Sequence, residues 1–460
     1  MRILFSAAYF ATLFIASIAC AQPLHCFHPD EVGGPREHNI DVEHLLLEIK
    51  FNPMEKLVTG KATHTFTPLH KAVDTIFLDA PGIRFSEVKL DGADARYTTS
   101  SKGITIYPAT PLAWNTRHLL TMTYEANPKR GLYFIGWDDT TGRSRKQIWT
   151  QGQGIDNRHW IPGFDDPNDK LISEVVVTFD SKYKVLSNGA QLKPKTNKDG
   201  TTTWHYRMTH PHALYLIMLG IGDYAIQKSA SQSGVPLNAY YYPDQPQALE
   251  PSYRYTADIM DFFESEIMVP YPWKSYSQIP VQEFLYGAME NTSATVFGDF
   301  FMVDSRGFLD RNYVGVNAHE MAHQWFGDMV TAKSVHDLWL QESFATHYAK
   351  LAEKHLFGTG HYLWNKRNEQ NSALNASLRD LYPIYHSKAG SPRIYPKGSF
   401  VLDMLKYVVG REQYNRVVAH YLKQHAYGNV TTFDFMDAFH DVLGINLDWF
   451  FNQWIYNGGE

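Results

Sequence analysis

One short stretch of this sequence combines two histidines and a glutamate at a spacing that can bind a metal ion. His319, Glu320 and His323 belong to the sequence His-Glu-Met-Ala-His. On a helix, 100° per residue places His323 about 40° and Glu320 about 100° from His319, so all three side chains point into one wedge. Two imidazoles one turn apart can share a metal ion, with Glu320 beside the remaining coordination position.

Glu342 is the expected third ligand. Eighteen residues separate it from His323, which lets the chain turn and bring a second, antiparallel helix back against the first. Two histidines and a glutamate form the ligand set of a catalytic zinc site, whereas a closed structural site needs four ligands, usually including cysteine. Cys20 and Cys26 are the only cysteines of the chain. We therefore expect one catalytic Zn²⁺ per chain rather than two solvated histidines.

The chemistry of such a site makes Glu320 the expected catalytic base. Zinc acts as a Lewis acid on a carbonyl and on water, and a carboxylate beside it can take a proton from that water and pass it to the leaving amine. The other ring nitrogen of a ligand histidine often bonds to a carboxylate. Asp337 and Asp328 are candidates for that second role.

The metal-binding residues lie in the half of the chain where helical patterns dominate. Apolar spacing predicts helices over 255–268, 313–326, 338–355, 360–376, 399–409, 412–423 and 432–442, with a short strand over 276–283 before the second helix. Ser399 and Thr432 are the expected N-caps of two of these helices, and Gly410 and Gly444 are expected C-caps.

Residues 38–225, in contrast, have strand patterns and almost no helical periodicity. The β-rich segments are 44–51, 75–79, 103–107, 118–124, 174–179, 201–208 and 214–220, and turn dipeptides such as Asp91-Gly92 separate them. We therefore expect an α+β multidomain protein in which an all-β saddle or sandwich domain precedes a mostly helical domain.

Upstream of the metal motif, residues 287–291 read Gly-Ala-Met-Glu-Asn. Together with His-Glu-x-x-His and the spacing to Glu342, this segment resembles the aminopeptidase N family of gluzincin zinc peptidases, which includes leukotriene-hydrolase relatives. Residues 150–153, 164–167, 325–327 and 337–340 are similar to family segments too. The resemblance runs from about residue 40 to the C-terminus. It implies a saddle-shaped β domain followed by a thermolysin-like catalytic domain.

The resemblance also implies roles in substrate binding. Glu290 matches the family glutamate that binds the free α-amino group of the substrate. Gly287 and Ala288 match the backbone that lies along the substrate as a strand would, with Met289 in the same segment. Gln153 stands where aminopeptidase N types usually have glutamate and the leukotriene-hydrolase type has glutamine, so it is expected to assist amine binding as a neutral acceptor.

Tyr395 lies in Tyr-Pro-Lys-Gly and matches the tyrosine whose hydroxyl stabilises the oxyanion of the tetrahedral intermediate. Gln341 and Ser343 flank Glu342 where the family usually has asparagine and glycine. These two departures are expected to alter packing around Glu342 rather than metal ligation.

The expected segments are a signal peptide at 1–21, the β domain at 22–228 and the catalytic domain at 229–460. Arg2, the apolar residues 3–18 and Ala19-Cys20-Ala21 are typical of a secretory signal, and the apolar run is shorter than the ~20 residues of a membrane-spanning helix. We expect export to the periplasm or the outside of the cell, with lipid anchoring at Cys20 the less favoured reading. The family's C-terminal helical domain is expected to be absent, in a two-domain member or a fragment.

The composition excludes one class of partner. A net charge of −6 provides no basic field for nucleic acid, and no integral membrane segment is expected after signal cleavage. The expected function is zinc-dependent hydrolysis of the first peptide bond of peptides with a free N-terminus. An epoxide hydrolase of the leukotriene-hydrolase type and a non-catalytic peptide-binding module stay open as alternatives.

Overall fold

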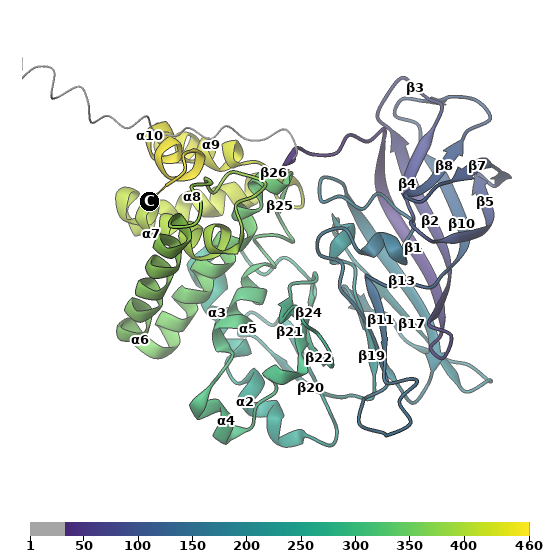
Figure 1. Cartoon of the computed structure of the whole chain (residues 1–460), viewed down its shortest axis with the longest axis horizontal. Helices are drawn as coiled ribbons and strands as arrows, with labels where there is room; N and C mark the ends of the chain where they lie inside the picture. The colour runs from purple at the N-terminus through teal and green to yellow at the C-terminus, as the bar shows by residue number, and fades with distance from the viewer. Residues whose placement is uncertain (1–32, 460) are drawn as a thin grey trace, which may run out of the picture.

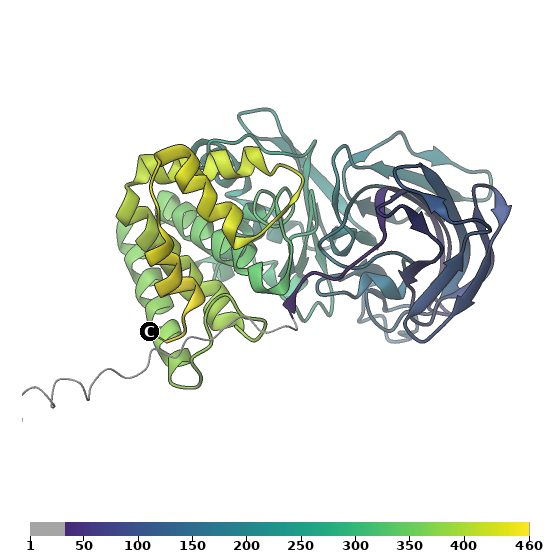
Figure 2. The ribbon, with the colours of Figure 1, turned by 90° about the horizontal axis from the view of Figure 1, so that it is seen from above.

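The computed structural model describes residues 33–459, so the predicted signal peptide at 1–21 lies outside the described residues. A β-rich half and a helical half lie side by side, as Figures 1 and 2 show. The predicted α+β organisation is thereby confirmed. No helix within the described residues is both long and apolar enough to cross a bilayer.

The largest sheet of the β-rich half has ten strands and follows the path β15-β17-β13-β1-β2-β10-β5-β6, with β16 and β18 attached at β17 and β13. Buried and half-exposed residues alternate along β13, as in a strand with one face on the core. The strands are β1 (Ile40–Asn52), β2 (Leu57–Pro68), β5 (Arg84–Leu90), β6 (Ala93–Asp94), β10 (His118–Ala126), β13 (Lys170–Asp180), β15 (Ala190–Gln191), β16 (Lys195–Thr196), β17 (Thr201–Arg207) and β18 (His212–Ala213).

Smaller sheets complete this half and share its apolar core. One sheet has the order β11 (Leu132–Ile135), β12 (Gln147–Thr150), β19 (Leu219–Gly222) and β14 (Lys184–Ser187), a second has β4 (Ile76–Asp79), β8 (Gly103–Tyr107) and β7 (Arg96–Thr99), and a third pairs β3 (Ala72–Val73) with β9 (Leu112–Ala113). Six of the seven predicted strands in this half correspond to strands of the structure.

The prediction for 214–220 is wrong in its first part. Residues Leu214–Leu216 form a 3-10 helix, and strand β19 begins only at Leu219. The side-chain amide of Asn157 donates hydrogen bonds to the carbonyls of Leu214, Tyr215 and Ile217, which turns this backbone away from a sheet. A continuous apolar run does not reveal such a side-chain partner.

A five-stranded sheet joins the two halves. Its order is β20 (Ala225–Ala230), β21 (Pro236–Tyr241), β22 (Tyr276–Val281), β24 (Ala294–Gly298) and β23 (Ala288–Met289). The strand predicted at 276–283 is β22, and the domain boundary expected at residue 228 falls inside β20. Side chains of β22 and β24 also belong to the apolar core of the β-rich half, so the two halves are packed together.

Helices make up the rest, in the green and yellow part of Figure 1. They are α2 (Leu249–Tyr253), α3 (Thr256–Ile267), α4 (Ser305–Asp310), α5 (Val314–Ala322), α6 (Trp339–Ser377), α7 (Gly398–Val409), α8 (Arg411–Gln424), α9 (Thr432–Leu443) and α10 (Asp448–Phe451), with the strand pair β25 (Thr331–Ala332) and β26 (Asn429–Val430). The helices predicted at 338–355 and 360–376 are two stretches of α6, separated by Gly358 with a φ of 86°. The other predicted helices are confirmed, although α5 ends four residues earlier than predicted.

The predicted C-caps Gly410 and Gly444 are confirmed, with φ of 86° and 65°. Both predicted N-caps are wrong. Thr431 caps α9 through reciprocal hydrogen bonds with Asp434, and Thr432 is the first helical residue. Ser399 lies inside α7, because a π-helical turn, Arg393–Lys397, leads into that helix without the break that an N-cap makes.

Candidate active site

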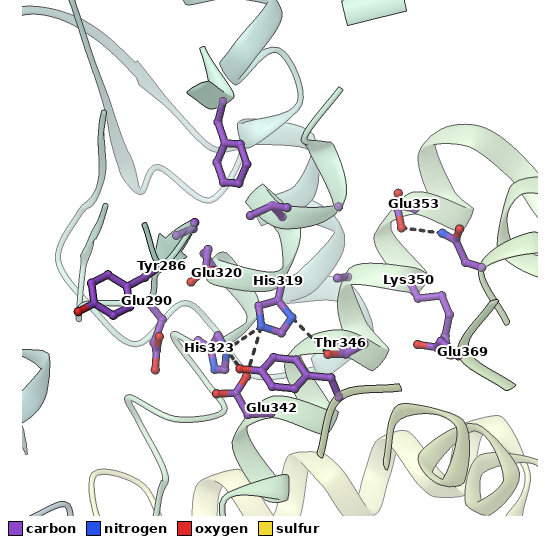
Figure 3. Close-up of a pocket in the computed structure, with 18 of the residues that line it drawn as sticks. Tyr286, Glu290, His319, Glu320, His323, Glu342, Thr346, Lys350, Glu353 and Glu369 are labelled. Carbon is purple, nitrogen blue, oxygen red and sulfur yellow. Dashed lines mark hydrogen bonds and ion pairs between the residues drawn. The ribbon is translucent and has the colours of Figure 1, made fainter. Parts of the chain in front are cut away.

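Helices α5 and α6 bring together the three predicted metal ligands. His319 lies on α5, His323 follows its last residue, and Glu342 lies in the first turn of α6. His319 Nε2 is 3.0 Å from His323 Nε2, and Glu342 Oε2 is 3.5 and 3.4 Å from these two nitrogens. Figure 3 shows the three side chains converging. Ligand atoms about 2.0–2.1 Å from a tetrahedral zinc ion would be about 3.3 Å apart, so the spacing fits zinc.

The surroundings of these ligands also fit a bound cation. Glu342 Oε2 is buried and has no hydrogen-bond partner, which a metal ion would provide. His323 Nδ1 donates to the carbonyl of Phe326 at 2.9 Å, which leaves Nε2 free as a ligand atom. Within residues 33–459, these ligands form the one group of three or more histidine, cysteine or acidic side chains close enough to share an ion.

Neither Asp337 nor Asp328 orients a ligand histidine, so that expectation is wrong. Asp337 instead accepts hydrogen bonds from the Ser334 hydroxyl and from the backbone and hydroxyl of Thr432. The partner of His323 is a backbone carbonyl, which no side-chain pattern reveals.

The partner of His319 is a side chain that sequence reasoning missed. Thr346 Oγ1 lies 3.4 Å from His319 Nδ1. Thr346 follows Glu342 by four residues, so helical spacing places both on the same face of α6, and that spacing could have identified it.

Burial and neighbouring charges act differently on the two carboxylates beside His319. Burial raises the pKa of Glu342, but the neighbouring imidazoles of His323 and His319 lower it by more, so this pKa lies below its usual range. Burial raises the pKa of Glu320 well above its usual range, with a further rise from the charges of Glu290 and Glu342. Glu342 therefore keeps the negative charge that a metal ligand needs, whereas Glu320 is the better proton acceptor.

The Gly-Ala-Met-Glu-Asn segment forms one wall of a cavity of about 590 Å³. The same cavity contains His319, His323 and Glu342, which are called the metal-binding group below because they are the predicted metal ligands. Gly287, with a φ of 91°, turns the chain into β23, and β23 is an edge strand whose partner, β24, covers only one side. Gly287 and Ala288 line the cavity. Met289 is buried, accepts a hydrogen bond from Gln151 Nε2, and does not line the cavity.

Glu290 and Gln153 also line this cavity. The Glu290 side chain is 3% exposed, and its Oε1 is buried without a hydrogen-bond partner. Gln153 lies in the loop after β12 and donates a long hydrogen bond of 3.4 Å to Glu342 Oε1. The two residues expected to bind an amine therefore lie in the same cavity as the metal-binding group.

Tyr395 faces the metal-binding group from the π-helical turn before α7. Its ring stacks on His319 with a centroid distance of 5.7 Å. Burial, followed by the charges of Glu342 and Glu290, raises the pKa of its hydroxyl, which therefore remains protonated and able to donate a hydrogen bond. One of the two sequence departures beside Glu342 holds this turn in place, because Ser343 Oγ donates to the Ile394 carbonyl at 2.6 Å.

The ligand geometry leads to a prediction about metal content. The wild-type protein is expected to retain about one zinc ion per chain after dialysis, and Glu342→Ala much less, because one of three ligands is lost. Elemental analysis of the purified proteins measures this, with Glu412→Ala, at an exposed position on α8, as the matched control. Near-stoichiometric zinc in Glu342→Ala would remove Glu342 from the ligand set.

Two family models match this chain. The peptidase family M1 domain matches residues 252–454, and the peptidase M1 N-terminal domain matches residues 35–216. Together they cover most of the sequence, including every predicted site residue.

The curated relatives that match this chain carry the names of aminopeptidases. The chain is 28% identical to a probable aminopeptidase 1 of Sulfurisphaera tokodaii, over 84% of this chain and 50% of the relative. It is 27% identical to an aminopeptidase N of Lactococcus lactis subsp. lactis, over 87% and 48%, and 30% identical to an aminopeptidase N of Streptomyces lividans, over 68% and 38%. The chain thus spans about half the length, or less, of these relatives. By its two matching domains, the chain belongs to peptidase family M1.

Proposed function

We propose that this chain is a zinc-dependent aminopeptidase that removes the first residue of peptides with a free N-terminus. The observation that carries the proposal is the unpartnered, buried carboxylate oxygen of Glu290 in the cavity of the metal-binding group. A buried anion without a partner is costly, and the α-ammonium of a peptide would complete it with a charge-assisted hydrogen bond. The names of the curated relatives support the same activity.

Different residues of the site bind different parts of the substrate. The peptide backbone lies against the open edge of β23, where Ala288 faces the cavity, and Glu290 fixes the α-ammonium so that only the first bond reaches the reactive centre. When bound by His319, His323 and Glu342, zinc supplies a Lewis acid that polarises the scissile carbonyl.

Proton transfer and charge stabilisation fall to two further residues. Glu320 takes a proton from the attacking water and delivers it to the nitrogen of the leaving peptide. The Tyr395 hydroxyl donates a hydrogen bond to the oxygen on which negative charge develops. Both residues line the same cavity as the ligands.

Beyond the ligands, the cavity is lined by polar and charged side chains that include Lys350, Glu353, Asn368 and Glu369. A lipid epoxide would require a deep apolar tunnel, so these charged side chains favour a peptide over the substrate of a leukotriene-type hydrolase. No observation favours a binding module without catalysis, since base, ligands and tyrosine converge in one cavity.

The need for a free amine tests the proposal. An α-amine with a pKa near 7.7–8.0 is mostly cationic at pH 7, and acetylation removes that charge and leaves Glu290 unpartnered. We expect kcat/KM for an acetylated alanyl anilide to be at least about tenfold below that for the free anilide, because hydrogen bonds to charged groups contribute about 1.5–3 kcal/mol. Glu290→Ala should remove most of this discrimination, and Gln153→Glu should lower KM for the free substrate.

The outcomes separate the alternatives. Equal rates on free and acetylated substrates would contradict an aminopeptidase and favour an endopeptidase with an open cleft. No hydrolysis of either substrate by the zinc-loaded protein would favour a binding module. Hydrolysis of an allylic epoxide in the absence of anilide hydrolysis would favour the leukotriene-type reaction.

A further inference from the structure

The cavity continues past the metal-binding group into a polar end that the proposed mechanism does not use. In Figure 3, Glu290 lies on one side of His319, and Lys350, Glu353 and Glu369 lie on the other. If Glu290 binds the α-ammonium, as proposed above, the residues after the scissile bond extend toward this second end. The inference below rests on that proposed function.

Helix α6 forms the floor of this end of the cavity. Glu342, Thr346, Ala349 and Glu353 follow one another at helical spacing and all line the cavity. The same helix face thus begins with a metal ligand and ends with a carboxylate that ligates nothing. A group bound by Glu353 would therefore lie on the leaving side of the scissile bond.

The two carboxylates at this end differ in their partners. Glu369 forms an ion pair with Lys350, whose Nζ also donates to Ser399 Oγ at 3.0 Å, so the lysine is neutralised and buried. Glu353, in contrast, accepts hydrogen bonds from the amide of Asn365 at 2.8 Å and from His361 Nε2 at 3.0 Å.

Glu353 has no fixed cationic partner, and its side chain is only 17% exposed. Among the described residues, no lysine or arginine forms an ion pair with it. The polar end therefore carries a negative charge that its own lysine does not neutralise.

A glycine on α5 makes room for this carboxylate. A Cβ atom on Gly315 would lie 3.0 Å from Glu353 Oε1, so the carboxylate packs directly against the helix backbone. Gly315 precedes His319 by four residues, which is about 6 Å along the helix. The backbone of one extended residue spans only about 3.5 Å, so the backbone of the first residue after the scissile bond does not cover this separation. A long side chain on that residue can cover it.

We propose that Glu353 binds a lysine or arginine side chain on the first residue of the leaving peptide and thereby makes the enzyme selective for a basic second residue of the substrate. A guanidinium or ammonium group would give the half-buried carboxylate a permanent cation, whereas Asn365 is neutral and an imidazole such as that of His361 is charged only when it is protonated. An acidic side chain in the same place would meet Glu353 and Glu369 and be disfavoured.

Two peptides that differ in one charge test this selectivity. Ala-Arg-Ala-Ala amide and Ala-citrulline-Ala-Ala amide have nearly the same shape, but citrulline is neutral. We expect kcat/KM for alanine release by the zinc-loaded wild type to be about tenfold higher with arginine. In Glu353→Gln the ratio between the two peptides should fall to within about twofold of one, whereas the control Glu412→Gln, at an exposed position of α8, should keep the wild-type ratio.

A second variant acts on the same contact without removing the carboxylate. Gly315→Ala adds a Cβ that forces the Glu353 carboxylate to shift by a few tenths of an ångström and narrows the cavity beside it, and alanine is compatible with the helical backbone of α5. This variant should also lower the arginine-to-citrulline ratio, and it decides the question if Glu353→Gln does not fold.

The results distinguish this inference from the proposed function. If the protein hydrolyses an alanyl anilide but cleaves the two peptides at equal rates, the proposed selectivity is wrong and the proposed aminopeptidase function is retained. A ratio that survives in both Glu353→Gln and Gly315→Ala would assign the selectivity to another residue and overturn the role of Glu353. Failure to hydrolyse even the anilide would count against the proposed function itself.

Discussion

Replacement of Glu320 by glutamine is expected to lower kcat on an alanyl anilide by roughly 10²–10⁴-fold while zinc content stays at about one per chain. Glutamine has nearly the same size and shape as glutamate, so the packing of α5 and the positions of His319 and His323 should be preserved. The amide, however, cannot accept the proton of the attacking water. The loss should therefore appear in catalysis and not in metal binding.

The position of Glu320 is the reason for this large expected effect. Its side chain is 6% exposed, lies beside the ligand histidines in the cavity, and has a pKa raised by burial. A carboxylate with a raised pKa is a stronger base toward water than an exposed one. In Figure 3 it lies between His319 and Glu290, the residue proposed to bind the amine, where the scissile bond is expected.

Two measurements on the same preparation test this expectation. Steady-state kinetics give the change in kcat, and elemental analysis gives the zinc content, with Glu412→Gln on α8 as the isosteric control at an exposed position. A loss of less than tenfold with a full complement of zinc would show that another group acts as the base. Loss of zinc would instead give Glu320 a part in holding the metal-binding group together.

The convergence of His319, His323 and Glu342 was predictable because the sequence information for it is local. Helix geometry fixes the relative directions of His319, Glu320 and His323, and the eighteen residues before Glu342 allow the return of a second helix. The alternation along β13 was equally clear, since one face packs on the core. Spacing alone, however, does not show what surrounds these residues.

What the sequence did not reveal depends on contacts between distant segments. The Phe326 carbonyl that orients His323 is backbone and has no sequence signature. The contact between Gly315 and Glu353 joins two helices, and its closeness follows from how α5 packs on α6. Similarly, the conformation of the backbone at 214–217 depends on hydrogen bonds from Asn157, which is distant in the sequence.

The misplaced helix starts have a different physical cause. Thr431 and Thr432 are both residues that favour N-caps, so composition does not choose between them. The choice is made by Asp434, whose carboxylate accepts a hydrogen bond from the Thr431 backbone N–H, and by Asp337, which accepts one from the Thr432 hydroxyl. Thr432 thereby links the start of α9 to the turn before α6, the helix that carries Glu342.

Removal of the Tyr395 hydroxyl is the second large effect that the structure leads us to expect. Tyr395→Phe should lower kcat by roughly 10²–10³-fold, the loss typical of one oxyanion-stabilising donor, with little change in KM. The ring should keep its stacking on His319, at 5.7 Å between centroids, because phenylalanine retains the aromatic plane. The variant therefore changes one hydrogen-bond donor and leaves the shape of the site almost intact.

The separation between kcat and KM is what identifies this role. The negative charge that the hydroxyl stabilises develops only along the reaction path, so its loss should raise the barrier without weakening substrate binding. A phosphinic peptide, which imitates the tetrahedral state, should correspondingly bind Tyr395→Phe more weakly by a factor similar to the loss in kcat. Tyr407→Phe, at a residue of α7 that is 90% exposed, removes a hydroxyl without entering the cavity and serves as the control. If KM rose while kcat and phosphinate affinity were retained, the hydroxyl would be bonded to the bound substrate rather than to the transition state, and the oxyanion would need another donor from the cavity wall.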